Sequence, residues 1–298
     1  MNHLLVINIE RLIKIILFNS DMLELLILKV IHSKPEEAQK LVPYIAQCDI
    51  FGPEAKAFGS EEDAVFQEHG WETMIDSKIK RDKFKKDNDQ ALRQSLRQNP
   101  PDESYAYHLI SQKALATHSR KIWIAERFSF VETMRGNEAY RTTKKAYEVG
   151  VHALALGDVA GSLEWFRTYF TEMQRLGELR DQHIGKNLDS TEQYLRNRYP
   201  QFQHKEPLRL MLFYGGMHNP ELYCKVPYKV VEIGDLNEYK LVEKDIKRLR
   251  KNEITPEENK LLLLQAAVWN IIEKDLKSIR QMSYPELCDY AIAEARKQ

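Results

Sequence analysis

Five short apolar runs alternate along the chain with longer segments in which apolar residues recur every three or four positions. The short runs are rich in β-branched and aliphatic residues and end at turn residues, which is typical of buried strands. They cover residues 25–32, 48–54, 121–127, 208–214 and 228–233. The segment PEEAQKLVPYIAQ, between the first two runs, has helical spacing. The opening therefore predicts a strand–helix–strand unit with parallel strands.

The longer segments predict helices. Within an α/β domain spanning residues 1–236, we expect helical insertions at about 55–120 and 136–206. Residues 237–298 carry two further helical patterns that open with Thr-Pro or Ser-x-Pro cap signals. These C-terminal helices are expected to pack on the sheet or to form a homodimer face. The predicted fold is α/β, with a mostly parallel sheet covered by helices, long helical insertions and a helical C-terminus.

Charge and cysteine content narrow the classes of function. Lys plus Arg and Asp plus Glu each number 44, so the formal net charge is zero and no global basic field recruits nucleic acid. The Lys-rich stretches IKRDKFKKD and KDIKRLRKN contain acidic residues and are expected to be solvated helix faces. The 3 cysteines are widely separated and form neither a disulfide framework nor a CxxC metal knuckle, which favours a cytoplasmic location.

The amino terminus, MNHLLVINIERLIKIILFNSDMLELLILKV, is apolar enough to raise the question of a membrane anchor. Charged residues such as Glu10 and Lys14 interrupt it, and no run approaches the roughly 20 apolar residues that span a bilayer. We therefore expect no association with a membrane. Met22, which directly precedes the first strand pattern, is a candidate native start.

Histidines follow two of the predicted strands in the same way. LRLMLFYGGMHNPEL runs an apolar strand through two glycines into His218, and Asn219 and Pro220 then signal a helix start. ELLILKVIHSKPEEA runs a strand into His32 and then a capping box. Neighbouring strands in one parallel sheet would bring both imidazoles to the same edge.

Charged residues end two further strands. CDIFGPEA ends at Glu54, and KIWIAERF ends at Glu126 and Arg127. Imidazoles together with carboxylates are the groups that a divalent-metal site or a general acid–base site requires. The alternative for both glutamates is a structural ion pair with an arginine at the edge of the sheet.

Several familiar catalytic motifs do not occur in the sequence. GxSxG, GxxxxGK[ST], GxGxxG and HExxH are all missing, which disfavours a serine hydrolase, a P-loop ATPase, a Rossmann dehydrogenase and a zincin. A thiol nucleophile at Cys48 or Cys224 stays open, because both lie close in sequence to the strand ends. A cysteine in a strand is nevertheless more often a small buried hydrophobe.

The ordered series of motifs resembles the TraB/TIKI superfamily, whose relatives include erythromycin esterases and ChaN-type haem-uptake proteins. The matching stretches are LKVIHSKPEEA, CDIFGPEA, IAERFSFVETMRG, GELRDQHIGKNL and LMLFYGGMHNPEL. They form five short patches within residues 25–222. The resemblance adds Arg180 and Asp181, on a predicted helix, as site candidates. The closing GGMH fits the family's GxxH, but Lys29 stands where the first GxxH motif has glycine.

The resemblance implies a doubly covered sheet with a polar cleft, and its members include metal-dependent peptidases, ester hydrolases and haem-binding proteins. We expect a hydrolase of amide or ester bonds that acts on a small-molecule or peptide substrate. His32, Glu54 and His218 would hold a divalent metal or position water directly. Metal identity stays open, because mixed His/carboxylate ligands suit several metals.

The remaining candidates have supporting roles in this hypothesis. A spare carboxylate takes a proton from water, Arg127 or Arg180 stabilises the oxyanion, and Asp181 orients an arginine or a histidine. Two other classes of function stay open. A non-catalytic protein that binds haem or an anionic metabolite is favoured by Lys29 in place of glycine, and an interaction scaffold would use the helical insertions to bind a partner.

Overall fold

A computed structural model describes residues 23–30, 35–54, 58–98, 102–216, 218–251, 255–272 and 276–298. The predicted site residue His32, the candidate start Met22 and the apolar segment before it lie outside these ranges. Within the described ranges, no helix combines the length and the apolar character needed to cross a membrane.

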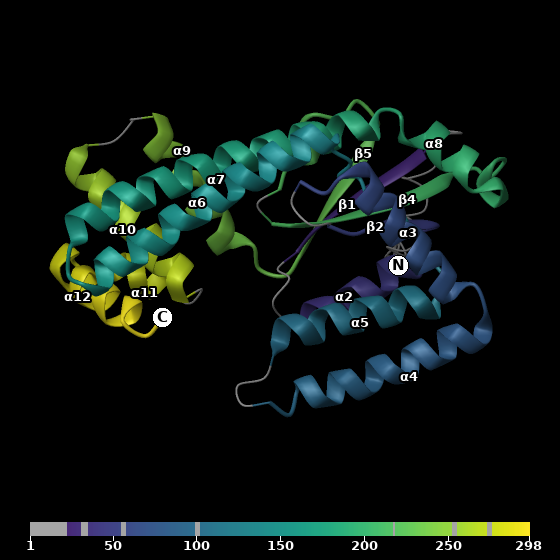
Figure 1. Cartoon of the computed structure of the whole chain (residues 1–298), viewed down its shortest axis with the longest axis horizontal. Helices are drawn as coiled ribbons and strands as arrows, with labels where there is room; N and C mark the ends of the chain where they lie inside the picture. The colour runs from purple at the N-terminus through teal and green to yellow at the C-terminus, as the bar shows by residue number, and fades with distance from the viewer. Residues whose placement is uncertain are drawn as a thin grey trace, which may run out of the picture.

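A five-stranded sheet with the order β3-β2-β4-β1-β5 forms the centre of the fold (Figure 1). The strands are β1 (Leu23–Val30), β2 (Ile50–Gly52), β3 (Lys121–Ile122), β4 (Leu208–Gly215) and β5 (Tyr228–Ile233). All four pairings are parallel. The predicted α/β fold with a parallel sheet is therefore confirmed. β2 is shorter than predicted because Pro53 has no N–H to donate to a neighbouring strand.

Helices fill both predicted insertions and the C-terminus. The first insertion contains α3 (Glu61–Ile75), α4 (Lys78–Ser95) and α5 (Glu103–Thr117), and it follows α2 (Pro35–Ile45) of the opening β–α–β unit. The second contains α6 (Phe130–Ala155), α7 (Val159–Leu188) and α8 (Thr191–Arg198). The C-terminus contains α9 (Asn237–Lys251), α10 (Pro256–Ile272), α11 (Leu276–Gln281) and α12 (Tyr284–Ala295).

Both faces of the sheet are covered, as its uninterrupted apolar strands require. Along β4, Leu210 and Leu212 face a core that includes Ile184 and Leu188 of α7. Met211 and Phe213 face the opposite core, which includes side chains of α2 and α5. α4 packs outside α5, away from the sheet (Figure 1). One face of the sheet thus carries α7, and this contact positions the site described below.

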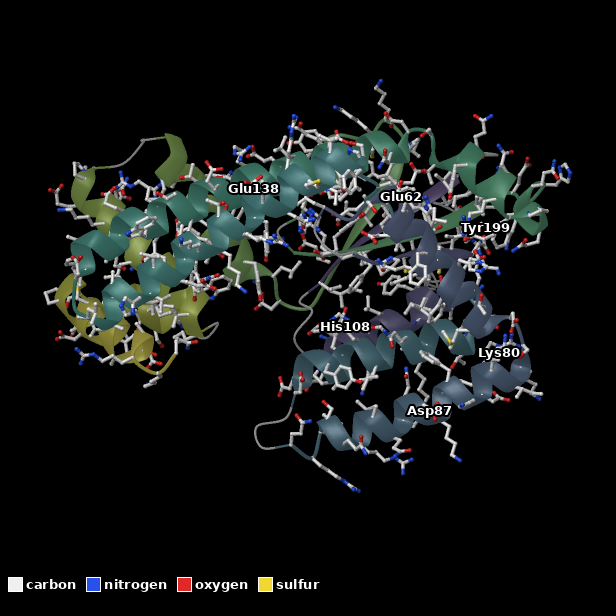
Figure 2. The ribbon with its side chains drawn as sticks, viewed as in Figure 1. Glu62, Lys80, Asp87, His108, Glu138 and Tyr199 are labelled. Atoms are coloured by element: carbon white, nitrogen blue, oxygen red, sulfur yellow. The ribbon has the colours of Figure 1, made fainter. Side chains whose placement is uncertain are left out.

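The first Lys-rich stretch lies on the outer helix α4, where Figure 2 labels Lys80 and Asp87. Lys80 Nζ lies 3.0 Å from Asp76 Oδ2, and Lys85 Nζ lies 2.7 Å from Asp82 Oδ1. The side chains of Lys80 and Lys85 are 49% and 30% exposed. The stretch is therefore a solvated helix face with locally paired charges.

A separate hydrophobic core lies away from the sheet. α6 and α7 run side by side from the sheet to the C-terminal helices (Figure 1). There Leu154 and Phe166 pack with residues of α10 and α12, including Leu264 and Leu287. The C-terminal helices thus contact the α6–α7 pair of the second insertion, and the homodimer face that was predicted as the alternative stays a prediction. Apolar periodicity shows which face of a helix is buried but not which element covers it.

Gly52 offers a test of how tightly the centre of the sheet is packed. A Cβ atom at this position would lie 2.4 Å from Leu212 Cδ2 and 3.2 Å from the carbonyl oxygen of Trp123. We expect Gly52→Ala to lower the free energy of unfolding by about 1–3 kcal/mol, measured by urea denaturation. Gly70→Ala is the matched control, because a Cβ there meets nothing within 4 Å. An equal effect of both substitutions would contradict the described packing.

Candidate functional site

The strands that precede the predicted site residues are neighbours. β4 lies between β1 and β2, with Val30 opposite Gly215 and Leu212 opposite Gly52. All three strands end at the same edge of the sheet because they are parallel. Glu54 and His218 follow β2 and β4 at this edge. The position of His32 after β1 lies outside the described residues.

Asp181 of α7 holds the turn that carries His218. Its Oδ1 accepts a hydrogen bond from His218 Nδ1 at 2.8 Å, and its Oδ2 accepts one from the backbone N–H of Asn219 at 2.8 Å. Gly185, one turn further along α7, allows this close approach. A Cβ there would lie 2.6 Å from Tyr223 Cβ and 2.8 Å from the carbonyl oxygen of Pro220. Asp181 thus fixes both the backbone and the ring orientation of His218.

Glu54 lies on the other side of the His218 ring. Its Oε2 accepts a hydrogen bond from the backbone N–H of Gly215 at 2.8 Å. Its Oε1 lies 3.4 Å from His218 Nε2. The imidazole therefore lies between two carboxylates, one at each ring nitrogen.

Arg180 and Glu126 form an ion pair beside the histidine. Arg180 donates from Nε to Glu126 Oε2 at 3.0 Å and from Nη2 to Oε1 at 2.6 Å. Its Nη1 lies 3.4 Å from His218 Nε2, and its Nη2 lies 3.8 Å from Glu54 Oε1. A two-point contact of this kind fixes the plane of the guanidinium. We call Glu54, Glu126, Arg180, Asp181 and His218 the charge cluster.

Exposure divides the charge cluster into accessible and buried members. The side chains of Glu54, His218 and Arg180 are 21%, 15% and 12% exposed. Those of Asp181 and Glu126 are 7% and 1% exposed. Glu54, His218 and Arg180 are therefore the members that a ligand from solvent can reach, and the buried carboxylates of Asp181 and Glu126 orient His218 and Arg180.

The surroundings of His218 favour its protonated form. Burial alone would lower its pKa, but the hydrogen bonds to Asp181 and Glu54 outweigh burial and raise the pKa to about 9. At neutral pH the ring therefore carries a proton on both nitrogens. Nδ1–H is donated to Asp181, and Nε2–H is directed toward Glu54.

The buried ion pair is also perturbed. Burial raises the pKa of Glu126, although the Arg180 guanidinium opposes the shift. Burial would lower the pKa of Arg180, but the facing Glu126 carboxylate raises it. A permanently charged Arg180 thus lies beside the accessible pair of Glu54 and His218.

Arg127 does not join the charge cluster. It donates to Glu68 of α3 and to the carbonyl oxygen of Ile124, and it lies 4.8 Å from the ring centroid of Tyr194. Glu68 is fully buried and also accepts from the backbone N–H of Ile124 at 2.8 Å. Arg127 therefore holds the segment after β3 against α3. Sequence analysis missed Glu68, because a glutamate in a polar helix gives no sign of burial.

Lys29, at the position where the first TraB/TIKI motif has glycine, is buried and paired. Its Nζ lies 2.5 Å from Glu221 Oε1 and donates to Asn219 Oδ1 at 2.6 Å. Both partners follow His218 in the chain. Lys29 thus holds the turn that carries the histidine, and its charge is matched by Glu221.

The two cysteines near the strand ends are poor nucleophiles. Cys48 is buried, and burial raises the pKa of its thiol to about 12. Burial also raises the pKa of Cys224. Because the thiolate is the reactive form, neither environment favours thiol chemistry at neutral pH.

The described residues do not by themselves fit a divalent metal. Among them, no group of three His, Cys, Asp or Glu side chains is arranged to hold a metal ion. Glu54 and His218 offer two donors, and the guanidinium of Arg180 lies 3.4 Å from His218 Nε2, where it would repel a cation. A catalytic zinc site usually has three protein ligands. The third predicted ligand, His32, lies outside the described residues.

Comparisons with protein-family models, with curated proteins and with solved structures found no match for this chain. The resemblance to the TraB/TIKI superfamily therefore stays a prediction that rests on the five quoted motifs.

The raised pKa of His218 can be tested by replacing its partner. Asp181→Asn removes the charge that faces Nδ1, and we expect the pKa of His218 to fall from about 9 by about one unit or more. Titration of the histidine ring signals by NMR measures the shift. Asp289→Asn, at an exposed position of α12, is the control and should leave this pKa unchanged. A pKa that is equal in all three proteins would show that Asp181 does not hold the ring.

The same shift predicts a pH-dependent stability. The pKa of His218 is raised from 6.5 to about 9 in the folded chain, so its stabilising effect is complete below about pH 6.5 and is lost as the pH rises through about 9. We expect the stability difference between wild type and His218→Gln to shrink between about pH 6 and pH 10, by a few kcal/mol at most. Urea denaturation at several pH values measures it. A difference that is constant with pH would contradict the shift.

Proposed function

We propose that the chain is a hydrolase of ester or amide bonds, with its reaction centre at Glu54 and His218. The observation that carries this proposal is the geometry of the accessible pair. A carboxylate and an imidazole approach within 3.4 Å at the carboxyl edge of a parallel sheet, each anchored by further hydrogen bonds. Ligands of open α/β sheets bind at this edge, and carboxylates and histidines are the usual proton-transfer groups.

Each member of the pair has a role in this proposal. Glu54 takes a proton from a water molecule, and the oxygen of that water attacks the carbonyl carbon of the substrate. His218, which is protonated at neutral pH, donates its Nε2 proton to the leaving oxygen or nitrogen as the bond to the carbonyl carbon breaks. The proton on Glu54 then returns to His218 Nε2 across their short separation. Base and acid are thereby restored.

The other members of the charge cluster support these steps. Arg180 Nη1 lies 3.4 Å from His218 Nε2, and in this proposal the guanidinium stabilises negative charge on the carbonyl oxygen of the substrate. Glu126 holds the plane of Arg180, and Asp181 holds the His218 ring. The support for these roles is that all their contacts are made within the chain before any substrate binds, as preorganised catalysis requires.

A metal-dependent form of the same hydrolase needs a third ligand, which sequence analysis assigns to His32. When bound, a divalent metal would polarise the substrate carbonyl or activate water. Elemental analysis of the purified protein distinguishes the two forms. We expect less than about 0.1 metal ion per chain and no loss of activity after chelation, because the described residues supply two donors only. Stoichiometric metal would support the metal-dependent form instead.

The proposal predicts the effect of two substitutions on hydrolysis. We expect Glu54→Gln and His218→Ala each to lower kcat/KM by about 10²–10⁴-fold, because each removes a proton-transfer group. The measurement is hydrolysis of a panel of p-nitrophenyl esters and p-nitroanilides. His204→Ala is the matched control, since this histidine is exposed and lies outside the charge cluster. A panel without any turnover, or a His218→Ala protein as active as wild type, would contradict the proposal.

A further inference from the structure

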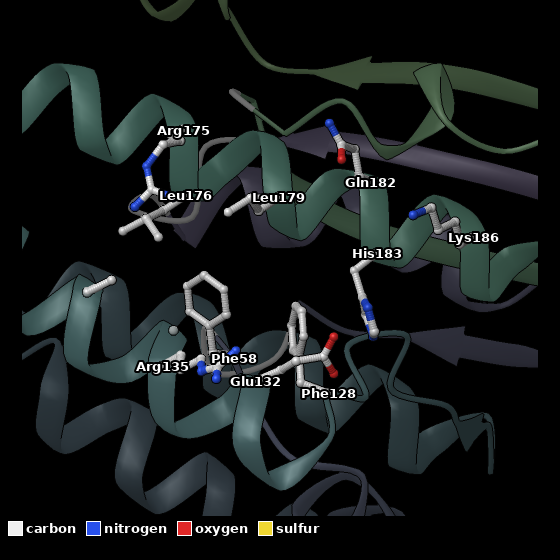
Figure 3. Close-up of a pocket in the computed structure, with 12 residues that line it drawn as sticks. Phe58, Phe128, Glu132, Arg135, Arg175, Leu176, Leu179, Gln182, His183 and Lys186 are labelled. Atoms are coloured by element: carbon white, nitrogen blue, oxygen red, sulfur yellow. The ribbon is translucent and has the colours of Figure 1, made fainter.

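A cavity of about 450 Å³ lies between the first turns of α6 and the second half of α7 (Figure 3). This volume suits a small organic molecule. Phe58, Phe128 and Leu176 form its buried apolar wall. None of the roles proposed above uses this cavity.

The cavity is adjacent to the charge cluster because the same three chain segments build both. Each of three cavity residues follows a member of the charge cluster closely in sequence. Phe58 follows Glu54, Phe128 follows Glu126, and His183 follows Arg180. Two residues of extended chain span about 7 Å, and three residues of helix rise about 4.5 Å. The cavity and the charge cluster therefore lie on neighbouring stretches of the same three segments.

Local backbone features shape the wall of the cavity. Phe58 has a φ of 54°, which is uncommon for a bulky residue and costs conformational energy. A Cβ at position 136 would lie 2.2 Å from Phe58 Cδ1, so the ring fits against α6 only because this residue is glycine. The ring of His183 stacks on Phe128 with a centroid distance of 4.0 Å. Figure 3 shows His183 reaching from α7 toward Phe128.

The polar part of the cavity is mainly positive. Arg135 comes from α6, whereas Arg175 and Lys186 come from α7 (Figure 3). Arg175 is paired with Glu172, to which its Nε donates at 2.8 Å, so Arg135 and Lys186 carry the positive charge that faces the cavity. The acidic lining residue Glu132 is engaged in a capping box, where its Oε2 accepts from the backbone N–H and Oγ of Ser129 at 3.0 and 2.6 Å. Its charge is thus partly compensated by the amino-terminal end of α6. An apolar wall with a cationic rim matches an apolar molecule that carries a carboxylate.

We infer that this cavity binds the part of the substrate that does not react, and that this part is an aromatic or aliphatic group bearing a carboxylate. The assignment of the ligand as substrate rests on the proposed function, whereas binding of such an anion does not. The apolar group of the ligand packs against Phe58 and Phe128, and its carboxylate pairs with Arg135. The scissile ester or amide then extends toward Glu54 and His218.

The test is calorimetric titration of the full chain with 2-naphthoate and with its neutral analogue 2-naphthylmethanol. We expect saturable binding of naphthoate below about 1 mM and at least about tenfold weaker binding of the alcohol. Arg135→Glu should weaken naphthoate binding by about tenfold or more. Arg141→Glu is the matched control, because it makes the same change on the same helix at an exposed position that does not line the cavity. It should bind within about twofold of wild type.

His218→Ala separates this inference from the proposed hydrolysis, because it removes the proposed acid and leaves the cavity intact. It should bind naphthoate like wild type, whether or not hydrolysis is found. Three results would overturn the inference. They are the absence of saturable naphthoate binding, equal effects of Arg135→Glu and Arg141→Glu, and loss of binding in His218→Ala, which would place the anion in the charge cluster.

Discussion

The carboxylate of Asp181 connects the two parts of the structure on which the site depends. One oxygen holds the His218 ring, and the other holds the backbone of Asn219 in the turn after β4. Asp181 can reach this turn only because α7 packs on the sheet through Ile184 and Leu188. The orientation of the imidazole is therefore set by helix–sheet packing rather than by the turn alone.

Electrostatics then determine what the site can do. Three carboxylates surround one guanidinium and one imidazole, and the surplus of negative charge keeps His218 protonated although it is buried. Burying so many charges is costly unless each has a partner. Each charge has such a partner, and the two most exposed members of the charge cluster are Glu54 and His218, which face each other. This arrangement explains why proton transfer is the chemistry that we assign to the site.

The sequence predicted most of the fold because apolar runs bounded by turn residues identify buried strands. All five predicted strands form, although β3 covers only Lys121–Ile122 of the predicted residues 121–127. The prediction that residues after parallel strands meet at one edge of the sheet correctly brings Glu54 beside His218. Arg180 and Asp181 were predicted as site residues only from the resemblance to the TraB/TIKI superfamily. The apolar pattern of a helix does not show which of its turns contacts the end of a strand. The pairing of Arg127 with Glu68 could not be predicted, because it joins residues 59 positions apart through packing.

The cavity between α6 and α7 could not be predicted from the sequence either. It depends on the left-handed backbone of Phe58 and on its fit against Gly136, two features that arise from contacts between distant segments. The packing of the C-terminal helices could not be predicted either. Their sequence shows which residues are apolar, but it does not show that these residues pack against the α6–α7 pair. Residue patterns thus identify elements and strand ends, whereas tertiary contacts decide which side chains meet.

A double-mutant cycle on kcat/KM tests the central claim most directly, namely that Glu54 and His218 act as one proton-transfer unit. If they do, the protein with both Glu54→Gln and His218→Ala will be about as active as the weaker single variant, because the second loss removes nothing further. If the two groups act independently, the two reductions will multiply, and that result would contradict the account.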